Sequence, residues 1–213
     1  SERFRLETPQ PSFPKVVAET VQKLVDHFEW KGPIGCGFPS IIKKGTALTA
    51  ANIHKEWIGT NVEKLFAKAT KCEVHVLNDA DAAGMAEMSI GDAKMKKGTV
   101  ILITIGTGLG SAVFLDGKLV PNSEFGHFYL KGHDTIAEKH ASNAARKRNK
   151  LSWDEWGVRF NEYLNHLELL LSPDLFILGG GACKKMEKFE HQLKIDAKIV
   201  PAKLQNNAGI VGA

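Results

Sequence analysis

The chain has 213 residues, 43% of them hydrophobic, and a formal net charge of +4, which exclude a disordered segment and a disulfide-stapled miniprotein. Its three cysteines, Cys36, Cys72 and Cys183, are widely separated and form no CxxC pair, so we expect a reducing, cytoplasmic environment and no cysteine zinc site. No apolar run is long enough to cross a membrane and the first residues do not resemble a signal peptide, so we expect no membrane partner.

The first part of the chain alternates predicted helices and strands. Apolar residues at helical spacing predict a helix over 14–28, with Pro14 in its first turn and Ser12 as its expected cap. Shorter patterns predict two strands, at 33–38 and 73–77, and two further helices, at 61–70 and 80–90. We expect the strand at 33–38 to be buried. This alternation indicates an α/β fold.

The second part begins with a β-branched run over 99–105, which has the length of a strand. A glycine-rich turn at 106–110 interrupts the run, and a second strand is predicted over 111–115. Asp116-Gly117 then predicts a two-residue hairpin turn before a short strand at 118–120.

The longest predicted helix covers 152–171. It starts at a capping box, Ser152-Trp-Asp-Glu, and stops before Ser172-Pro173. A short apolar run over 175–178 predicts a buried strand that leads into three consecutive glycines, 179–181.

Two predicted strands therefore end in glycine-rich turns, at 106–110 and 179–181. Such turns let backbone N–H groups approach phosphate oxygens without interference from side chains. A plain β-hairpin explains 106–110 equally well, because strands flank it on both sides. Neither turn carries the Rossmann GxGxxG pattern and the Walker GxxxxGK[ST] pattern is absent, which disfavours both classes of nucleotide-binding protein.

A second set of residues is suited to binding hydroxyl groups. Asn78 and Asp79 lie where a predicted strand meets a helix, a common position for site residues in α/β sheets, although Asp79 could equally serve as a helix cap. Glu124 and His127 are three residues apart and converge if their segment is helical. With Glu138, these side chains offer both acceptors and donors to vicinal hydroxyls.

Several segments resemble the ROK family of sugar kinases and, within it, the polyphosphate-dependent glucokinases. They are NDADAAG at 78–84, TIGTGLGSA at 104–112 and EFGH at 124–127, followed in order by 137–142, 151–156, 172–181 and 206–212. The resemblance implies an α/β, actin/hexokinase-like (ribonuclease H-like) fold of two lobes. Residues 1–78 would be the remainder of an incomplete N-terminal lobe, and 79–213 the C-terminal lobe.

The resemblance also implies roles for individual residues. Asp79 would be the general base that takes the proton from the 6-hydroxyl of glucose or a similar hexose. The other hydroxyls would be held by Asn52, Asn78, Glu124, His127 and Glu138. The donor, polyphosphate or ATP with Mg²⁺, would lie against the glycine turns, at Gly106, Thr107, Gly108, Gly110, Gly179, Gly180 and Gly181. The family resemblance further leads us to expect a homodimer.

The sequence departs from the ROK pattern at two points. Many members bind zinc through a histidine and cysteines that follow the segment equivalent to 124–127, whereas 127–138 contains no cysteine, so zinc is not expected. Members usually begin with a DxGGT-like phosphate loop, which this sequence lacks. Its first residues, 3–9, are instead expected to form the third strand of the first lobe.

Two questions stay open at this point. A non-catalytic sugar-binding or regulatory ROK protein is the alternative function, although Asp79 favours an enzyme because binding alone needs no base. The donor is equally open, as is the choice between glucose and mannose. Two groups of basic residues either hold a polyphosphate chain or form ordinary solvated surface; they are Lys184 with Lys185, and the cluster at 146–150. No aromatic residues interleave with that cluster, so we expect no nucleic-acid partner.

Overall fold

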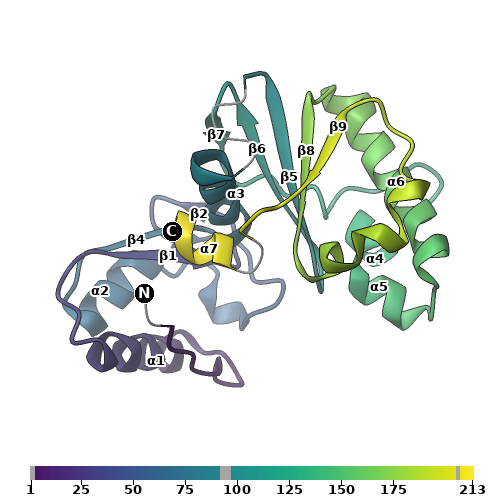
Figure 1. The fold of residues 1–213 in the computed structure, drawn as a ribbon. Coiled ribbons are helices and arrows are strands. Elements are labelled where there is room, and N and C mark those ends of the chain that lie inside the picture. Colours follow the sequence, from purple (N-terminus) through teal and green to yellow (C-terminus); the bar gives the residue numbers. More distant parts are fainter. Residues whose placement is uncertain (1–2, 92–96, 205–206) are drawn as a thin grey trace.

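The structure, a computed structural model, describes residues 3–91, 97–204 and 207–213. Figure 1 shows a smaller part that contains the N-terminus and a larger part built on a five-stranded sheet. The elements of the smaller part are α1 (Pro14–His27), β1 (Ile34–Phe38), β2 (Ile42–Lys43), β3 (Thr46–Ala47), η1 (Lys55–Trp57), α2 (Val62–Thr70) and β4 (Val74–Asn78). Those of the larger part are α3 (Asp79–Ile90), β5 (Thr99–Ile105), β6 (Leu109–Leu115), β7 (Lys118–Val120), α4 (Ala137–Ala141), α5 (Asn143–Arg148), α6 (Trp153–Leu171), β8 (Leu175–Gly179), η2 (Gly181–Lys188), η3 (Glu190–Gln192), β9 (Lys198–Pro201) and α7 (Ala208–Gly212).

The smaller part is organised around the parallel pair β1 and β4. Helices α1 and α2 pack against each other, and buried aromatic residues fill the space beneath the strands. The rings of Phe38 and Trp57 lie 4.7 Å apart between centroids, and Phe66 meets both edge-on. This core fixes the end of β4, where Asn78 and Asp79 lie.

The larger sheet has the order β7-β6-β5-β8-β9 and is covered on both faces. Successive residues of β5 alternate between these faces, as the pleat requires. Val100 and Leu102 belong to the cluster that includes Ala83 of α3, whereas Ile101 and Ile103 pack in the cluster that contains α6. Because both faces are buried, β5 reads as a continuous apolar run.

Most of the predicted elements are confirmed. The strand over 99–105, the Asp116-Gly117 hairpin turn, the capping box at Ser152 and the helix that follows it are all present. Both turn residues have positive φ, 49° at Asp116 and 78° at Gly117, as a two-residue hairpin of this type needs.

Three predictions about the N-terminal part are wrong. Ser12 does not cap α1, because Phe13 occupies the cap position; the buried Ser12 hydroxyl instead accepts a hydrogen bond from the His54 N–H at 3.0 Å. Residues 3–9 form no strand, and neither Pro9 at the end of the segment nor Pro11 just after it has an N–H group to donate to a ladder. The strand at 33–38 is only partly buried, since β4 is its sole neighbour among the described residues.

Helix α3 connects the two parts. It contacts β1 on one side and β6 on the other, and α7, from the end of the chain, packs on both α3 and β1 (Figure 1). The division of the chain into two lobes at residue 78 therefore stays a prediction. Helix α3, which begins at residue 79, contacts elements on both sides of this boundary. None of the helices within the described ranges combines the length and the apolar character needed to cross a bilayer.

Candidate active site

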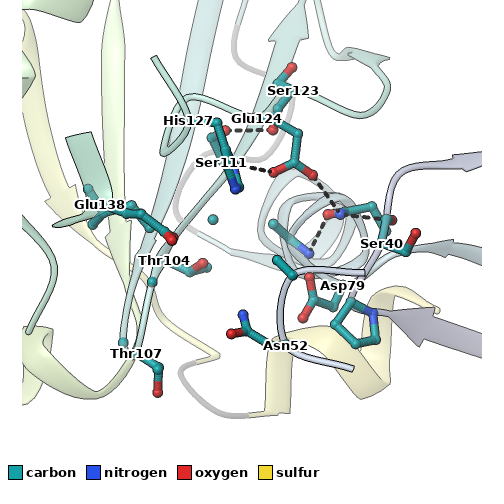
Figure 2. A pocket seen from close by; sticks show the side chains of 18 of the residues that line it. Ser40, Asn52, Asp79, Thr104, Thr107, Ser111, Ser123, Glu124, His127 and Glu138 are labelled. Atoms are coloured by element: carbon teal, nitrogen blue, oxygen red, sulfur yellow. Dashed lines mark hydrogen bonds and ion pairs between the residues drawn. The ribbon is translucent and has the colours of Figure 1, made fainter. Parts of the chain in front are cut away.

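A cavity of about 530 Å³ lies where β4 and α3 meet the ends of β5 and β8 (Figure 2). Most of the residues predicted for the sugar and donor sites line this cavity. They are Asn52, Asn78, Asp79, Gly106, Thr107, Gly108, Gly110, Glu124, His127, Glu138 and Gly180. Segments that are far apart in sequence thus converge on one space, as the predicted sugar and donor sites require.

Asn78 caps helix α3, the role that the sequence also allowed for Asp79. Its Oδ1 accepts hydrogen bonds from the N–H groups of Ala80 at 2.8 Å and Asp81 at 3.2 Å. Its Nδ2 donates to the carbonyl of Ser40 at 3.2 Å and, more weakly, to Glu124 at 3.5 Å. Because all its hydrogen-bonding capacity is used, Asn78 can contact a ligand only by exchanging the long bond to Glu124.

Asp79 is the first residue of α3, and it lines the cavity while Asn78 takes the cap position. Desolvation by the surrounding protein raises the pKa of Asp79, while backbone N–H groups at the helix start oppose this shift. A raised pKa brings a carboxylate closer to the range in which it works as a general base.

Glu124 and His127 lie in a turn rather than in the helix assumed from their spacing. The His127 N–H donates to the Glu124 carbonyl at 3.0 Å, and the two side chains form an ion pair of 3.3 Å between Nδ1 and Oε2. Burial raises the pKa of Glu124; the positive charge of His127 lowers it, and the carboxylates of Asp79 and Asp81 raise it. Glu124 and His127 therefore offer the cavity a hydrogen-bond acceptor and a donor that are paired with each other (Figure 2).

Serine and threonine residues that the sequence analysis missed hold these segments in position. Ser111, buried within β6, donates to the Ser123 carbonyl at 2.7 Å and accepts from the Phe125 N–H at 3.0 Å, which fixes the segment bearing Glu124. On the opposite wall, the Ser40 hydroxyl donates to the Thr49 carbonyl at 2.8 Å. A serine inside an otherwise apolar strand was the one sequence signal that pointed to such a role.

The two glycine turns lie side by side because β5 and β8 are parallel neighbours in register, with Thr104 opposite Gly179. Parallel strands end at the same sheet edge, which is where ligands bind in such sheets. The hairpin explanation of 106–110 is confirmed, since the segment joins the antiparallel strands β5 and β6. The segment also lines the cavity, and its contact with donor phosphates stays a prediction. Gly180 has a φ of 84° and a ψ of 178°, a conformation that only glycine adopts readily.

Glu138 reaches the cavity from α4. Its carboxylate lies against Gly108 so closely that a Cβ at Gly108 would overlap it. The helix is fixed from behind by Trp156, whose buried indole N–H donates to the Ala141 carbonyl at 2.9 Å. Glu138 therefore lies beside the glycine turn, opposite Asp79 and Asn52 (Figure 2).

Gly179 and Gly181 lie outside the main cavity. Gly179 lines a smaller adjoining cavity of about 50 Å³ with Gly180, Cys183 and Lys184, whereas Gly181 lines neither. The turn opens 3₁₀ helix η2, which is kinked at Lys185, rather than the regular helix assumed for this segment. The dipole of such a short, kinked helix would therefore attract a phosphate only weakly. The positive charge beside the smaller cavity is that of Lys184.

Asp81 behind the cavity makes a pH-dependent contribution to stability. It is 1% exposed, Oδ2 accepts from the Asn122 N–H at 2.8 Å, and Oδ1 has no partner among the described residues. Burial raises the pKa of Asp81 to about 6. The folded state therefore holds this proton more tightly than the unfolded chain, and ionisation destabilises the fold as the pH rises from about 4 to 6.

We expect Asp81→Asn to remove this dependence. The free energy of unfolding of the variant, relative to the parent, should increase by about 2 kcal/mol between pH 4 and pH 7, as the shift implies. Urea denaturation at a series of pH values measures it. A difference between variant and parent that is constant with pH would contradict the assignment.

The comparisons with known proteins agree with this geometry. A profile of the ROK family matches residues 1–141. A polyphosphate glucokinase of Mycobacterium tuberculosis (strain CDC 1551 / Oshkosh) is 43% identical over the whole chain, which spans 80% of that protein.

Solved structures extend the similarity to three dimensions. The inorganic polyphosphate/ATP-glucomannokinase of Arthrobacter sp. strain KM superposes with a TM-score of 0.93 and 47% identity, over 100% of this chain and 86% of that one. A ROK family glucokinase of Streptomyces griseus, in complex with glucose and AMPPNP, shares the fold with a TM-score of 0.78 at 22% identity, over 98% of this chain and 89% of that one. The actin/hexokinase-like fold expected from the sequence is therefore confirmed, and the chain belongs to the ROK family.

Proposed function

We propose that this protein is a glucokinase that transfers a phosphoryl group from polyphosphate or ATP to the 6-hydroxyl of glucose. The observation that carries the proposal is that one cavity contains the carboxylate of Asp79, which does not occupy the cap position of α3, opposite two adjacent glycine turns. The similarity to polyphosphate glucokinase and to polyphosphate/ATP-glucomannokinase supports the choice of substrates.

The proposed reaction assigns the sugar to the wall formed by β4, α3 and the 123–127 segment. Asp79 accepts the proton of the 6-hydroxyl, and the resulting oxygen attacks the terminal phosphorus of the donor. The bond from that phosphorus to its bridging oxygen breaks, and the donor leaves one phosphoryl group shorter. The remaining hydroxyls would bond to the amides and carboxylates of the same cavity, namely Asn52, Asn78, Glu124, His127 and Glu138.

The donor would lie along the glycine turns. Gly106, Gly108 and Gly110 expose backbone without side chains, and Gly180 continues this surface from the neighbouring strand. Phosphoryl transfer depends mainly on positioning and charge neutralisation, which backbone N–H groups and a nearby lysine can provide.

Mg²⁺ fits the donor set of the cavity. This ion is usually held by substrate phosphates, waters and few protein oxygens, and the hydroxyls of Thr104 and Thr107 beside the glycine turns offer oxygen ligands that leave Asp79 free to act as the base. When bound, Mg²⁺ would neutralise charge on the donor phosphates.

The proposal is tested by following phosphorus in ³¹P NMR while the protein is incubated with glucose, Mg²⁺ and either polyphosphate or ATP. We expect a resonance of glucose 6-phosphate, and 6-deoxyglucose should inhibit its formation without being phosphorylated. Glucose binding without any phosphorylated product from either donor would instead support the non-catalytic sugar-binding alternative.

Lys184 should distinguish the two donors. It lines the smaller cavity that shares Gly180 with the main one, so a long phosphate chain leaving the glycine turns would pass it. Lys184→Glu is expected to raise KM for polyphosphate more than KM for ATP, with the larger effect at low salt, where charges are least screened. Lys185→Glu should have a smaller effect, because Lys185 lines neither cavity.

The matched control is Lys188→Glu, an exposed lysine of the same 3₁₀ segment that lines neither cavity. Initial rates at several ionic strengths give the KM values. Equal KM for polyphosphate in the Lys184→Glu and Lys188→Glu variants would assign Lys184 to the solvated surface and favour ATP as the donor.

A further inference from the structure

Three side chains converge outside the main cavity, where α4, α6 and the segment before α4 meet. His133 Nε2 is 2.8 Å from Oε1 of Glu162, and His140 Nε2 is 3.0 Å from Oε2 of the same carboxylate. The two imidazole rings lie 4.1 Å apart between centroids. One donor atom from each of the three residues can be chosen so that all lie within 4.8 Å of one another.

The cluster is partly shielded from water and combines one carboxylate with two imidazoles. The His140 side chain is 12% exposed, and burial, followed by the neighbouring His133, lowers the pKa of His140; Arg159 contributes in the same direction. Partial burial alone would raise the pKa of Glu162, but its hydrogen bonds to the two histidines lower it. The groups that face the cluster thus comprise a carboxylate, two imidazoles and one guanidinium.

We propose that His133, His140 and Glu162 form a binding site for a divalent transition metal ion of the zinc type. Neutral imidazole nitrogens with one carboxylate suit Zn²⁺ or Co²⁺, whereas Mg²⁺ and Ca²⁺ prefer sites made of oxygen alone. In a four-coordinate zinc site the ligand atoms are about 3.3 Å apart, so an ion would draw together the three ligand atoms that now lie within 4.8 Å of one another, with water as a fourth ligand.

The sequence analysis did not find this site, because it searched for cysteines next to His127. Glu162 follows His140 by 22 residues and lies on a different helix, so no short motif links the ligands. The sequence led us to expect no zinc, because 127–138 contains no cysteine. The site proposed here uses other ligands and departs from that expectation.

A bound ion would connect α4 to α6 through side chains that approach from three segments. Glu138, which lines the cavity, lies on α4 two residues before His140. Metal binding would therefore stabilise the wall that carries Glu138, and it should raise the melting temperature of the protein. This consequence does not depend on which reaction the cavity performs.

The test uses the whole protein after treatment with a chelator and without substrates. Co²⁺ is added while visible absorption is recorded, and Zn²⁺ is titrated by calorimetry. We expect one ion per chain, Co²⁺ bands of tetrahedral intensity and a higher melting temperature with Zn²⁺. Loss of a group that only supports a ligand weakens metal binding by about 10- to 100-fold, so Glu162→Gln and His133→Gln should each weaken it at least 100-fold.

The control is His191→Gln, which removes an exposed histidine paired with Asp154 at 2.7 Å and should bind metal like the parent. Circular dichroism checks that each variant is folded, and His133→Gln, at the more exposed of the two histidines, decides the test if Glu162→Gln does not fold. A parent that binds neither ion, or ligand variants that bind as tightly as the parent, would overturn the proposal and leave a hydrogen-bonded His-Glu-His triad.

Discussion

Replacing Asp79 by asparagine is expected to lower kcat by about 10² to 10⁴ and to leave the affinity for glucose close to that of the parent. The amide keeps the shape of the side chain but cannot accept the proton of the 6-hydroxyl. The fold should be unaffected, because Asn78 and not Asp79 caps α3.

Initial rates and glucose binding by calorimetry measure the two quantities separately. Asp154→Asn, at an exposed carboxylate far along the chain on α6, is the control and should retain the parent's activity. In the parent, kcat should fall as the pH drops through the pKa of Asp79, which burial raises above its ordinary value. An Asp79→Asn variant that keeps most of its kcat would exclude Asp79 as the base.

Gly180→Ala is expected to have the second largest effect, on both stability and turnover. A Cβ at this position would lie 2.5 Å from the carbonyl oxygen and 2.6 Å from the nitrogen of Ile105, so the end of β5 would have to move. The backbone conformation itself costs a non-glycine residue about 1 to 3 kcal/mol. Displacement of the adjacent glycine turn by about 1 Å could reduce turnover about 10²-fold.

Two control glycines separate these causes. Gly117 has a comparable φ of 78° but open space around it, so Gly117→Ala should cost only the backbone strain, about 1 to 2 kcal/mol, and leave kcat unchanged. Gly181→Ala, which meets no atom within 4 Å, should be close to neutral. Denaturation and steady-state kinetics on the three variants provide the comparison, and equal losses at Gly180 and Gly117 would show that the contact with Ile105 is unimportant.

The predictions that depended on local sequence were the accurate ones. The capping box at Ser152, the Asp-Gly hairpin and the β-branched run of β5 each fix their own backbone through neighbouring residues. Ser12 and residues 3–9 were misassigned because their roles depend on residues elsewhere in the chain. The Ser12 hydroxyl is used by the His54 N–H, 42 residues away.

The candidate site was predictable as an inventory of residues but not as an arrangement. Motif order identified Asp79, Glu124 and the glycine turns, whereas the meeting of the two glycine turns follows from the parallel register of β5 and β8, which sequence does not specify. Ser111 was missed because its function is to hold the backbone around Glu124, a contact without a sequence pattern. The His133, His140 and Glu162 cluster was missed for the same reason.

The most direct test of the account is a crystal structure of the protein with glucose, Mg²⁺ and a non-hydrolysable phosphate donor. We predict that the 6-hydroxyl oxygen lies within about 3 Å of an Asp79 carboxylate oxygen, with the terminal phosphorus between that hydroxyl and the turn at Gly106 to Gly110. A structure in which glucose binds with a different hydroxyl at Asp79, or in which the donor phosphates lie away from the glycine turns, would contradict it.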